Sequence, residues 1–361
     1  MDLAAYRTQA EAFVCECSRE YYEHFAGLKH DLAIEPIYER HAPLFDRAAV
    51  DELRAIAAHS SGDDERRRLA ALLEFCVEGF IGQATKTTEA ELARREATLT
   101  IEVDGDTVGY REAAFVQSNE ADRERRERLE QARLEAIDEQ LNPLAREALE
   151  QAHALARELG WRSYREMFGE LKRIDLEGLE RQTAVFSRAS DEVYASIVEP
   201  ELERTAGVTL DRLRRSDLPW FHRAVAFDSL FPAEGLLPSF EQTLKGLGID
   251  VAARANVTLD VERRPKKSPR AFCAPVRVPQ EVYLVIGPVG GRDDYVALLH
   301  EGGHAQHYAA VDPSLAFEFR QLGDSSVTEG FAFLFDHLVE DAEWLRRRLG
   351  VRDVAPLAAH A

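Results

Sequence analysis

Residues 298–307 read Leu-Leu-His-Glu-Gly-Gly-His-Ala-Gln-His, and the interpretation of the whole chain depends on this segment. On an α-helix His300 and His304 are four residues apart, so their imidazoles project from one face and can reach a single metal ion. Glu301 then lies beside the ion, where its carboxylate can take a proton from water. Gly302 and Gly303 each cost a helix about 1 kcal/mol relative to Ala, which predicts that another segment approaches closely there.

A catalytic zinc site needs a third protein ligand, with the fourth position left for water. The metzincin pattern has Gly at position 307 and His at position 310, whereas this chain has His307 and Ala310, so that class is excluded. The remaining candidates are the carboxylates that follow the motif formed by residues 300–304, His-Glu-Gly-Gly-His. They are Glu318, Asp324, Glu329 and Asp336.

Glu329 is the favoured third ligand. It lies 25 residues after His304, within the strongly apolar segment 325–335, where a buried acid needs a partner such as a metal ion. Glu318 is flanked by aromatic residues and followed by Arg320, so an ion pair is the simpler explanation for it. His307 is expected to support the ligands or to serve in packing, and His337 is expected to serve in packing or to lie at the surface.

The composition is that of an acidic globular protein. Apolar residues make up 45% of the 361 residues, enough for a sizeable core, and the net charge of −20 argues against nucleic acid or an anionic membrane as a partner. No apolar run approaches the roughly 18 residues of a membrane span, and the N-terminus lacks a signal-peptide pattern. The four cysteines match no metal-binding spacing. These features predict a cytoplasmic protein.

Most of the chain has apolar residues at helical spacing, which predicts a mainly α fold. Alternating residues around Asp104-Gly105 predict a β-hairpin near residues 98–110. Three short strand-like runs, 257–262, 271–276 and 281–286, predict a small β-sheet next to the motif helix. The last run is a candidate edge for pairing with an extended peptide. Gly160-Trp161 suggests a boundary between an N-terminal helical region with the hairpin, 1–160, and a catalytic region, 161–361.

The motif, His307 and the later Glu329 together resemble the thimet oligopeptidase and oligoendopeptidase F family of zinc metallopeptidases. The segment Leu259–Cys273 is similar to the family's strand segment with Asp, Lys and a Gly-Ala-aromatic run, although Arg270 stands in place of that glycine. Residues 290–296 take the place of its glycine turn before the active-site helix. The specific likeness covers residues 257–335.

This resemblance implies an elongated, helical, zincin-like body with a deep channel. It implies one Zn²⁺ per chain, held by His300, His304 and Glu329, with Glu301 activating water. The implied activity is hydrolysis of internal bonds in short, unfolded peptides. Two alternatives stay open: a carboxypeptidase or other amide hydrolase with the same site, and a non-catalytic or weakly active helical protein with a structural zinc. The presence of Glu301 argues against a purely structural metal, which has no use for a base.

The family has further helices after the third ligand, which carry a Tyr and a His that stabilise the oxyanion. This sequence ends 32 residues after Glu329, so we expect a C-terminally truncated chain. We then expect exposed apolar surface near Phe331, Phe333 and Phe335, covered by a partner chain or by self-association. Tyr283 and Tyr308 are the remaining candidates for an oxyanion donor.

Overall fold

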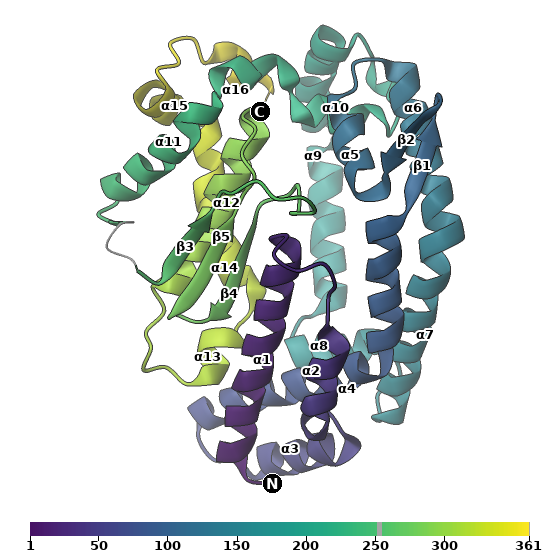
Figure 1. The fold of residues 1–361 in the computed structure, drawn as a ribbon, viewed down its shortest axis with the longest axis vertical. Coiled ribbons are helices and arrows are strands. Elements are labelled where there is room, and N and C mark those ends of the chain that lie inside the picture. Colours follow the sequence, from purple (N-terminus) through teal and green to yellow (C-terminus); the bar gives the residue numbers. More distant parts are fainter. Residues whose placement is uncertain (251–254, 361) are drawn as a thin grey trace. The chain divides into compact units, whose positions relative to one another are not determined.

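The computed structural model describes residues 1–250 and 255–360 and shows the predicted mainly helical fold with two small sheets (Figure 1). The described residues form two compact units. The first combines Met1–Gly79 with Val225–Ala359, and the second comprises Phe80–Ala224 together with His360. The predicted domain boundary at residue 160 falls between two helices of the second unit and stays a prediction.

The first unit contains the motif helix and the larger sheet. Its helices are α1 (Leu3–Phe25), α2 (Ile34–Arg40), α3 (Arg47–His59), the start of α4 (Asp63–Thr98), α11 (Ala233–Gly246), α12 (Arg292–Ala309), α13 (Phe317–Gln321), α14 (Ser325–Asp336), α15 (Ala342–Leu349) and most of α16 (Ala355–His360). Its strands are β3 (Val257–Asp260), β4 (Phe272–Arg277) and β5 (Glu281–Val285).

The second unit contains the hairpin, the rest of α4 and the helices from α5 to α10. Its elements are β1 (Thr100–Val103), β2 (Asp106–Gly109), α5 (Tyr110–Asn119), α6 (Arg123–Ala136), α7 (Asn142–Glu158), α8 (Tyr164–Lys172), α9 (Leu176–Ala206) and α10 (Asp217–Arg223). Along the described part of the chain, no helix is both long and apolar enough to cross a bilayer.

The predicted hairpin is confirmed. Strands β1 and β2 pair in antiparallel register, with Val103 opposite Asp106. The two residues between them, Asp104 and Gly105, both have positive φ, of 56° and 88°, as a tight two-residue turn requires. Ile101 and Val103 pack from β1 against Leu129 of α6, which anchors the hairpin in the core of the second unit.

The larger sheet has the strand order β3-β5-β4, in which β5 is parallel to β3 and antiparallel to β4. The expectation that residues 281–286 form a sheet edge is therefore wrong. Val282, Leu284 and Val285 are at most 1% exposed, as expected of an apolar strand with neighbours on both sides. Within the described residues the outer strand beside the motif helix is β4.

The two faces of this sheet are covered by different helices. Helix α1 packs on one face, where Tyr22 stacks on Tyr283 at 3.8 Å between ring centroids (Figure 1). Helix α12 reaches β4 through Glu301, whose carboxylate accepts a hydrogen bond from the backbone N–H of Cys273. The sheet thus holds the motif helix at a defined distance from its outer strand.

A buried lysine ties the ends of β3 and β5 together. The Lys267 ammonium donates to a side-chain oxygen of Asp260 and to the backbone carbonyls of Asp260, Glu262 and Ile286. Burial opposes ionisation of Asp260, but the cations of Arg264 and Lys267 outweigh it and hold the pKa of that carboxyl below its ordinary value. This network fixes the strand ends just before the turn that leads into α12.

Candidate metal centre

The glycine turn before α12 sets where the motif helix begins. Gly290 and Gly291 have φ of 93° and 96°, a region that L side chains rarely adopt. The Asp294 carboxylate accepts hydrogen bonds from the backbone N–H groups of Val289 and Gly290, both at 2.6 Å. The turn therefore directs the chain out of the sheet and starts the helix at Arg292.

The two glycines of the motif permit the close packing that the sequence predicts. A Cβ added at Gly303 would lie 2.6 Å from the carbonyl oxygen of Phe331 and 2.7 Å from the Cα of Ala332, both in α14. A Cβ added at Gly302 would lie 2.3 Å from the ring of Phe240 in α11. The predicted close approach is confirmed, and at Gly303 it brings α14, the helix that carries Glu329, against α12.

We expect Gly303→Ala to destabilise the protein, although alanine is the better helix former. The gain in helix propensity of about 1 kcal/mol is outweighed by overpacking against backbone, which typically costs about 1–3 kcal/mol. Urea unfolding measures the net loss. The matched control is Gly330→Ala on α14, where an added Cβ meets nothing within 4 Å and stability is expected to rise or stay level. Equal effects at both positions would contradict the packing argument.

The structure brings His300, His304 and Glu329 together. His300 Nε2 lies 3.6 Å from Glu329 Oε2, and His304 Nε2 lies 3.8 Å from Glu329 Oε1. One nitrogen from each histidine and one carboxylate oxygen all lie within 4.8 Å of one another, and among the described residues this is the one such cluster of potential metal ligands. Their side chains are 23%, 12% and 44% exposed, so solvent reaches the cluster.

The other ring nitrogen of each histidine is held by a side chain of α14. His300 Nδ1 lies 3.0 Å from Asp336 Oδ2, and His304 Nδ1 lies 2.8 Å from Thr328 Oγ1. An acceptor at Nδ1 places the proton on that nitrogen and leaves the Nε2 lone pair available to a metal. Burial lowers the pKa of His304, which favours the neutral imidazole that binds metals.

These residues fit zinc. Two ligand atoms bound to one tetrahedral zinc at about 2.0–2.2 Å lie roughly 3.3–3.6 Å apart. The two nitrogen-to-oxygen distances of 3.6 Å and 3.8 Å are close to that range. Two imidazoles and one carboxylate form a donor set typical of catalytic zinc sites, which keep one position open.

Glu301 lies beside this cluster, and it is not one of the two side chains, Asp336 and Thr328, that contact the histidine Nδ1 atoms. Its Oε2 accepts a hydrogen bond of 2.8 Å from the Cys273 backbone N–H. Burial raises the pKa of Glu301 above its usual value, although the Cys273 N–H and His300 oppose this. A carboxylate with a raised pKa is suited to accept and return a proton near neutral pH. Burial also raises the pKa of the neighbouring Cys273 thiol, which keeps it protonated and unsuited to bind metal.

The other candidate third ligands have different partners. Glu318 is fully buried and paired with Arg7 at 2.6 Å and Arg68 at 3.3 Å, which matches the ion-pair explanation. Asp324 caps the N-terminus of α14 by accepting from the Ser326 N–H. Asp336 contacts the cluster through His300 Nδ1. Sequence reasoning missed the supporting roles of Asp336 and Thr328, although Asp336 lies two helical turns after Glu329 and so on the same helix face.

The other side chains that the sequence analysis named, His307, His337 and Tyr283, lie in packed positions or at the surface. The His307 ring stacks on Phe331 at 4.7 Å, and the His337 side chain is 73% exposed, as expected. The Tyr283 hydroxyl donates to Glu281, and its ring stacks on Tyr22 on the sheet face covered by α1. It therefore does not face the cluster.

The outward face of α14 is apolar. Phe331 and Phe333 are 44% and 53% exposed, as predicted, whereas Phe335 is buried, so the expectation for that residue is wrong. Val327 and Leu334 add to the exposed face. The Phe333 ring meets the His300 ring edge-on at 5.5 Å, so this apolar surface continues up to the cluster.

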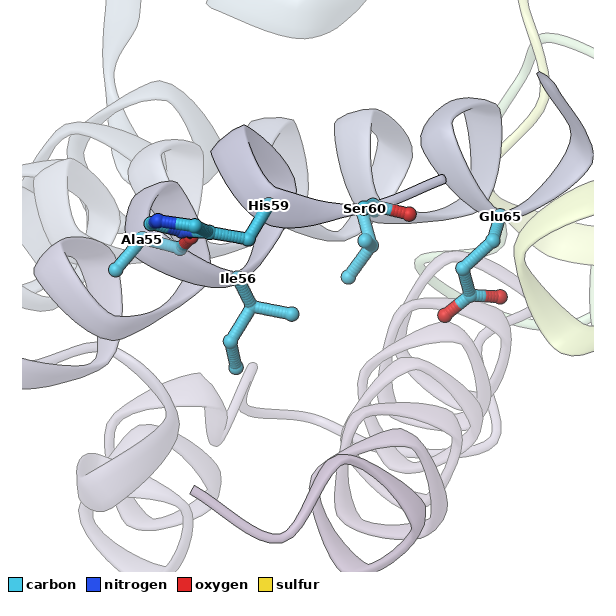
Figure 2. A pocket seen from close by; sticks show the side chains of 6 residues that line it. Ala55, Ile56, His59, Ser60 and Glu65 are labelled. Carbon is cyan, nitrogen blue, oxygen red and sulfur yellow. The ribbon is translucent and has the colours of Figure 1, made fainter. Parts of the chain in front are cut away.

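A separate open pocket of about 440 Å³ lies between α3 and the start of α4 (Figure 2). It is lined by Ala55, Ile56, His59, Ser60, Glu65 and Leu69. The His59 Nδ1 is 2.7 Å from the Ala55 carbonyl, and Glu65 accepts from Arg7. The pocket includes none of the cluster residues, so the candidate chemistry lies elsewhere in this unit.

Comparison with known proteins supports the fold. No family model and no curated protein matches the sequence. Among solved structures, the chain is similar to a "putative oligoendopeptidase F" from Bacillus anthracis str. Ames, with a TM-score of 0.55 and 12% sequence identity. The match covers 94% of this chain and 62% of the other, so the chain spans less than two thirds of that protein's length. The two proteins share a mainly α fold.

Proposed function

We propose that this protein is a zinc-dependent metallopeptidase that hydrolyses internal bonds of short, unfolded peptides. One observation carries the proposal: two imidazole Nε2 atoms and a carboxylate converge on one point, and a second, half-buried carboxylate, that of Glu301, lies outside this set of potential ligands. Such a second carboxylate can serve as the general base for hydrolysis, whereas a structural metal has no use for a base. The fold shared with an oligoendopeptidase is consistent with this proposal.

His300, His304 and Glu329 would hold one zinc ion per chain. When bound there, zinc acts as a Lewis acid toward a carbonyl oxygen and lowers the pKa of water. Glu301 accepts the proton of the attacking water and returns it to the leaving amine. Its Oε2 is held by the Cys273 N–H, so Oε1 is the oxygen that exchanges the proton. The Asp336 carboxylate accepts from His300 Nδ1–H and so keeps the Nε2 of that imidazole free, and the Thr328 hydroxyl does the same for His304 when it accepts.

The outer strand β4 is the place for an extended peptide. The Cys273 N–H points to Glu301 and therefore away from β5. Because backbone groups alternate along a strand, those of Pro275 point the same way. Proline has no N–H, so this edge offers the carbonyl oxygens of Cys273 and Pro275 as acceptors for a peptide's N–H groups.

We expect the zinc-loaded protein to cleave short peptides whose two ends are blocked by acetylation and amidation. An endopeptidase needs no free terminus, whereas a carboxypeptidase needs a free carboxylate. Mass spectrometry of the products identifies internal cleavage, and a zinc chelator should abolish it until zinc is added back. The control is a stably folded protein, which should stay intact. If the protein cleaves the same peptide only when its ends are unblocked, the carboxypeptidase alternative is favoured. Efficient digestion of the folded protein would contradict the proposed restriction to short, unfolded peptides.

We further propose that a partner chain or a second copy of this chain covers the exposed face of α14. The face formed by Val327, Phe331, Phe333 and Leu334 is large and apolar for a surface helix. We expect the isolated chain to be a weak catalyst that self-associates, with an apparent mass that rises with concentration in size-exclusion chromatography with light scattering. Leu334→Gln, at a position 66% exposed, should reduce the association. A monomer at all concentrations with high turnover would contradict both expectations.

A further inference from the structure

The free edge of β4 is bordered by aromatic side chains of α1. Helix α1 packs on the sheet through Tyr22, and β4 is an outer strand of that sheet among the described residues. At about 100° per residue, Arg19 lies on one flank of the Tyr22 contact, and it pairs with Glu281 at the start of β5. Phe25 lies on the opposite flank, where its ring meets the Phe272 ring of β4 edge-on at 6.3 Å. This second flank of α1 therefore faces the free edge of β4.

Tyr21 extends this flank by one helical turn. Its ring stacks on that of Phe25, with 6.2 Å between the centroids and an interplanar angle of 10°. Tyr21 is 44% exposed, and Phe25 and Phe272 are half-buried, so a ligand can contact all three rings. We call the surface formed by Tyr21, Phe25 and Phe272 the aromatic ridge. None of the three side chains carries a charge, so the ridge suits an apolar group that stacks or packs on it.

The aromatic ridge lies at the same level of β4 as the candidate general base. The Cys273 N–H donates to Glu301, and Phe272 is the next residue along the strand. Successive side chains of a strand point to opposite faces, and Phe272 and Ala274 both pack on the α1 face. A peptide that pairs with this edge would have its attacked bond near Cys273, because Glu301 handles the proton there.

Alternation along an extended peptide then assigns one side chain to the ridge. The two residues that flank a peptide bond point to opposite faces of the chain, so one of them points to the α1 face. We propose that the aromatic ridge is a specificity subsite, which binds a large apolar side chain next to the cleaved bond. The inference rests on the proposed function and adds the class of side chain that the protein selects. A charged side chain would lose water there and gain no partner from the ridge.

A series of acetylated and amidated, alanine-rich peptides with one phenylalanine at each position in turn tests the preference. We expect kcat/KM to rise by about 10-fold when phenylalanine occupies one of the two positions that flank the cleaved bond, because a large apolar side chain is then buried. Aspartate at the same position should be cleaved more slowly than alanine. Mass spectrometry of the products places the cleaved bond. No preference at either flanking position would overturn the proposal.

Variants of the ridge link the preference to these rings. Tyr21→Ala and Phe25→Ala should each lower the ratio of kcat/KM for the phenylalanine and alanine peptides by about 3–10-fold, the value of a lost aromatic contact. Tyr21 is 44% exposed, so its variant remains a valid test should Phe25→Ala lose stability. Phe115→Ala, at a position 54% exposed on α5, is the matched control and should leave the ratio unchanged. An unchanged ratio in Tyr21→Ala, or an equal loss in Phe115→Ala, would overturn the proposal.

Peptide binding without cleavage distinguishes this inference from the proposed function. In the metal-free protein, fluorescence anisotropy of labelled peptides should show tighter binding of the phenylalanine peptide than of the alanine peptide, and Tyr21→Ala should remove most of the difference. Cleavage with no such preference would refute the subsite and leave the peptidase intact. Absence of cleavage together with the Tyr21-dependent binding would refute the peptidase, while the ridge would keep its ligand. Absence of both would refute both proposals.

Discussion

Glu301→Gln is expected to lower peptide turnover by about 10²–10⁴-fold while zinc stays bound, because a general base is removed without loss of a ligand. The amide keeps the shape of the side chain, and its oxygen can still accept the hydrogen bond from the Cys273 N–H. It cannot accept a proton from water. Steady-state kinetics together with the measured zinc content of the purified variant provide the test.

Two results would contradict this role for Glu301. If zinc is lost together with activity, Glu301 is a ligand and the arrangement around His300 and His304 must be different. If turnover is unchanged, another group takes the proton. A parent protein with stoichiometric zinc, no turnover on any peptide and no change in Glu301→Gln would favour the structural-zinc alternative.

Glu329→Ala is expected to weaken zinc binding by more than the roughly 10–100-fold typical of an outer-shell partner, because one of three protein ligands is removed. The carboxylate faces both Nε2 atoms at 3.6 Å and 3.8 Å, and no other described carboxylate joins that cluster. Isothermal titration with zinc measures the loss. Because Glu329 is 44% exposed, the variant should fold normally.

Glu318→Ala and Asp324→Ala are the controls. Both should retain zinc, although Glu318→Ala should lose stability because it leaves Arg7 and Arg68 without their buried partner. Asp324→Ala removes a helix cap at a cost of about 1 kcal/mol. A protein that loses zinc in Glu318→Ala and keeps it in Glu329→Ala would refute both the 25-residue spacing argument and the likeness to the peptidase family.

Local chemistry made several features predictable. Alternation around Asp104-Gly105 is a short-range signal, and the hairpin follows from it. The four-residue spacing of His300 and His304 holds on any helix, so both imidazoles had to project from one face. Gly303 in a helix predicted close packing, and α14 is the segment that approaches it. Glu329 is less buried than the apolar segment around it predicts, because its side chain is 44% exposed.

Other features depended on contacts between distant segments. Residues 281–285 became a central strand because β3 and β4 pair on either side, and no local pattern distinguishes a central strand from an edge strand of similar composition. Phe335 is buried while Phe331 and Phe333 are exposed, because only one face of α14 packs on α12. Apolar residues all round a helix do not indicate which face is covered.

By itself, the sequence determined the mainly helical class, the hairpin, the helix with two histidines and a carboxylate, and a short set of acids as third ligand. Periodicity and residue spacing arise within a single helix or strand, so the sequence alone is enough to predict the features that depend on them. Only the tertiary structure decided which acid meets the histidines, and which side chains hold their other nitrogens. Asp336 and Thr328 acquire those roles because α14 lies against α12 at Gly303, a contact between residues far apart in the chain.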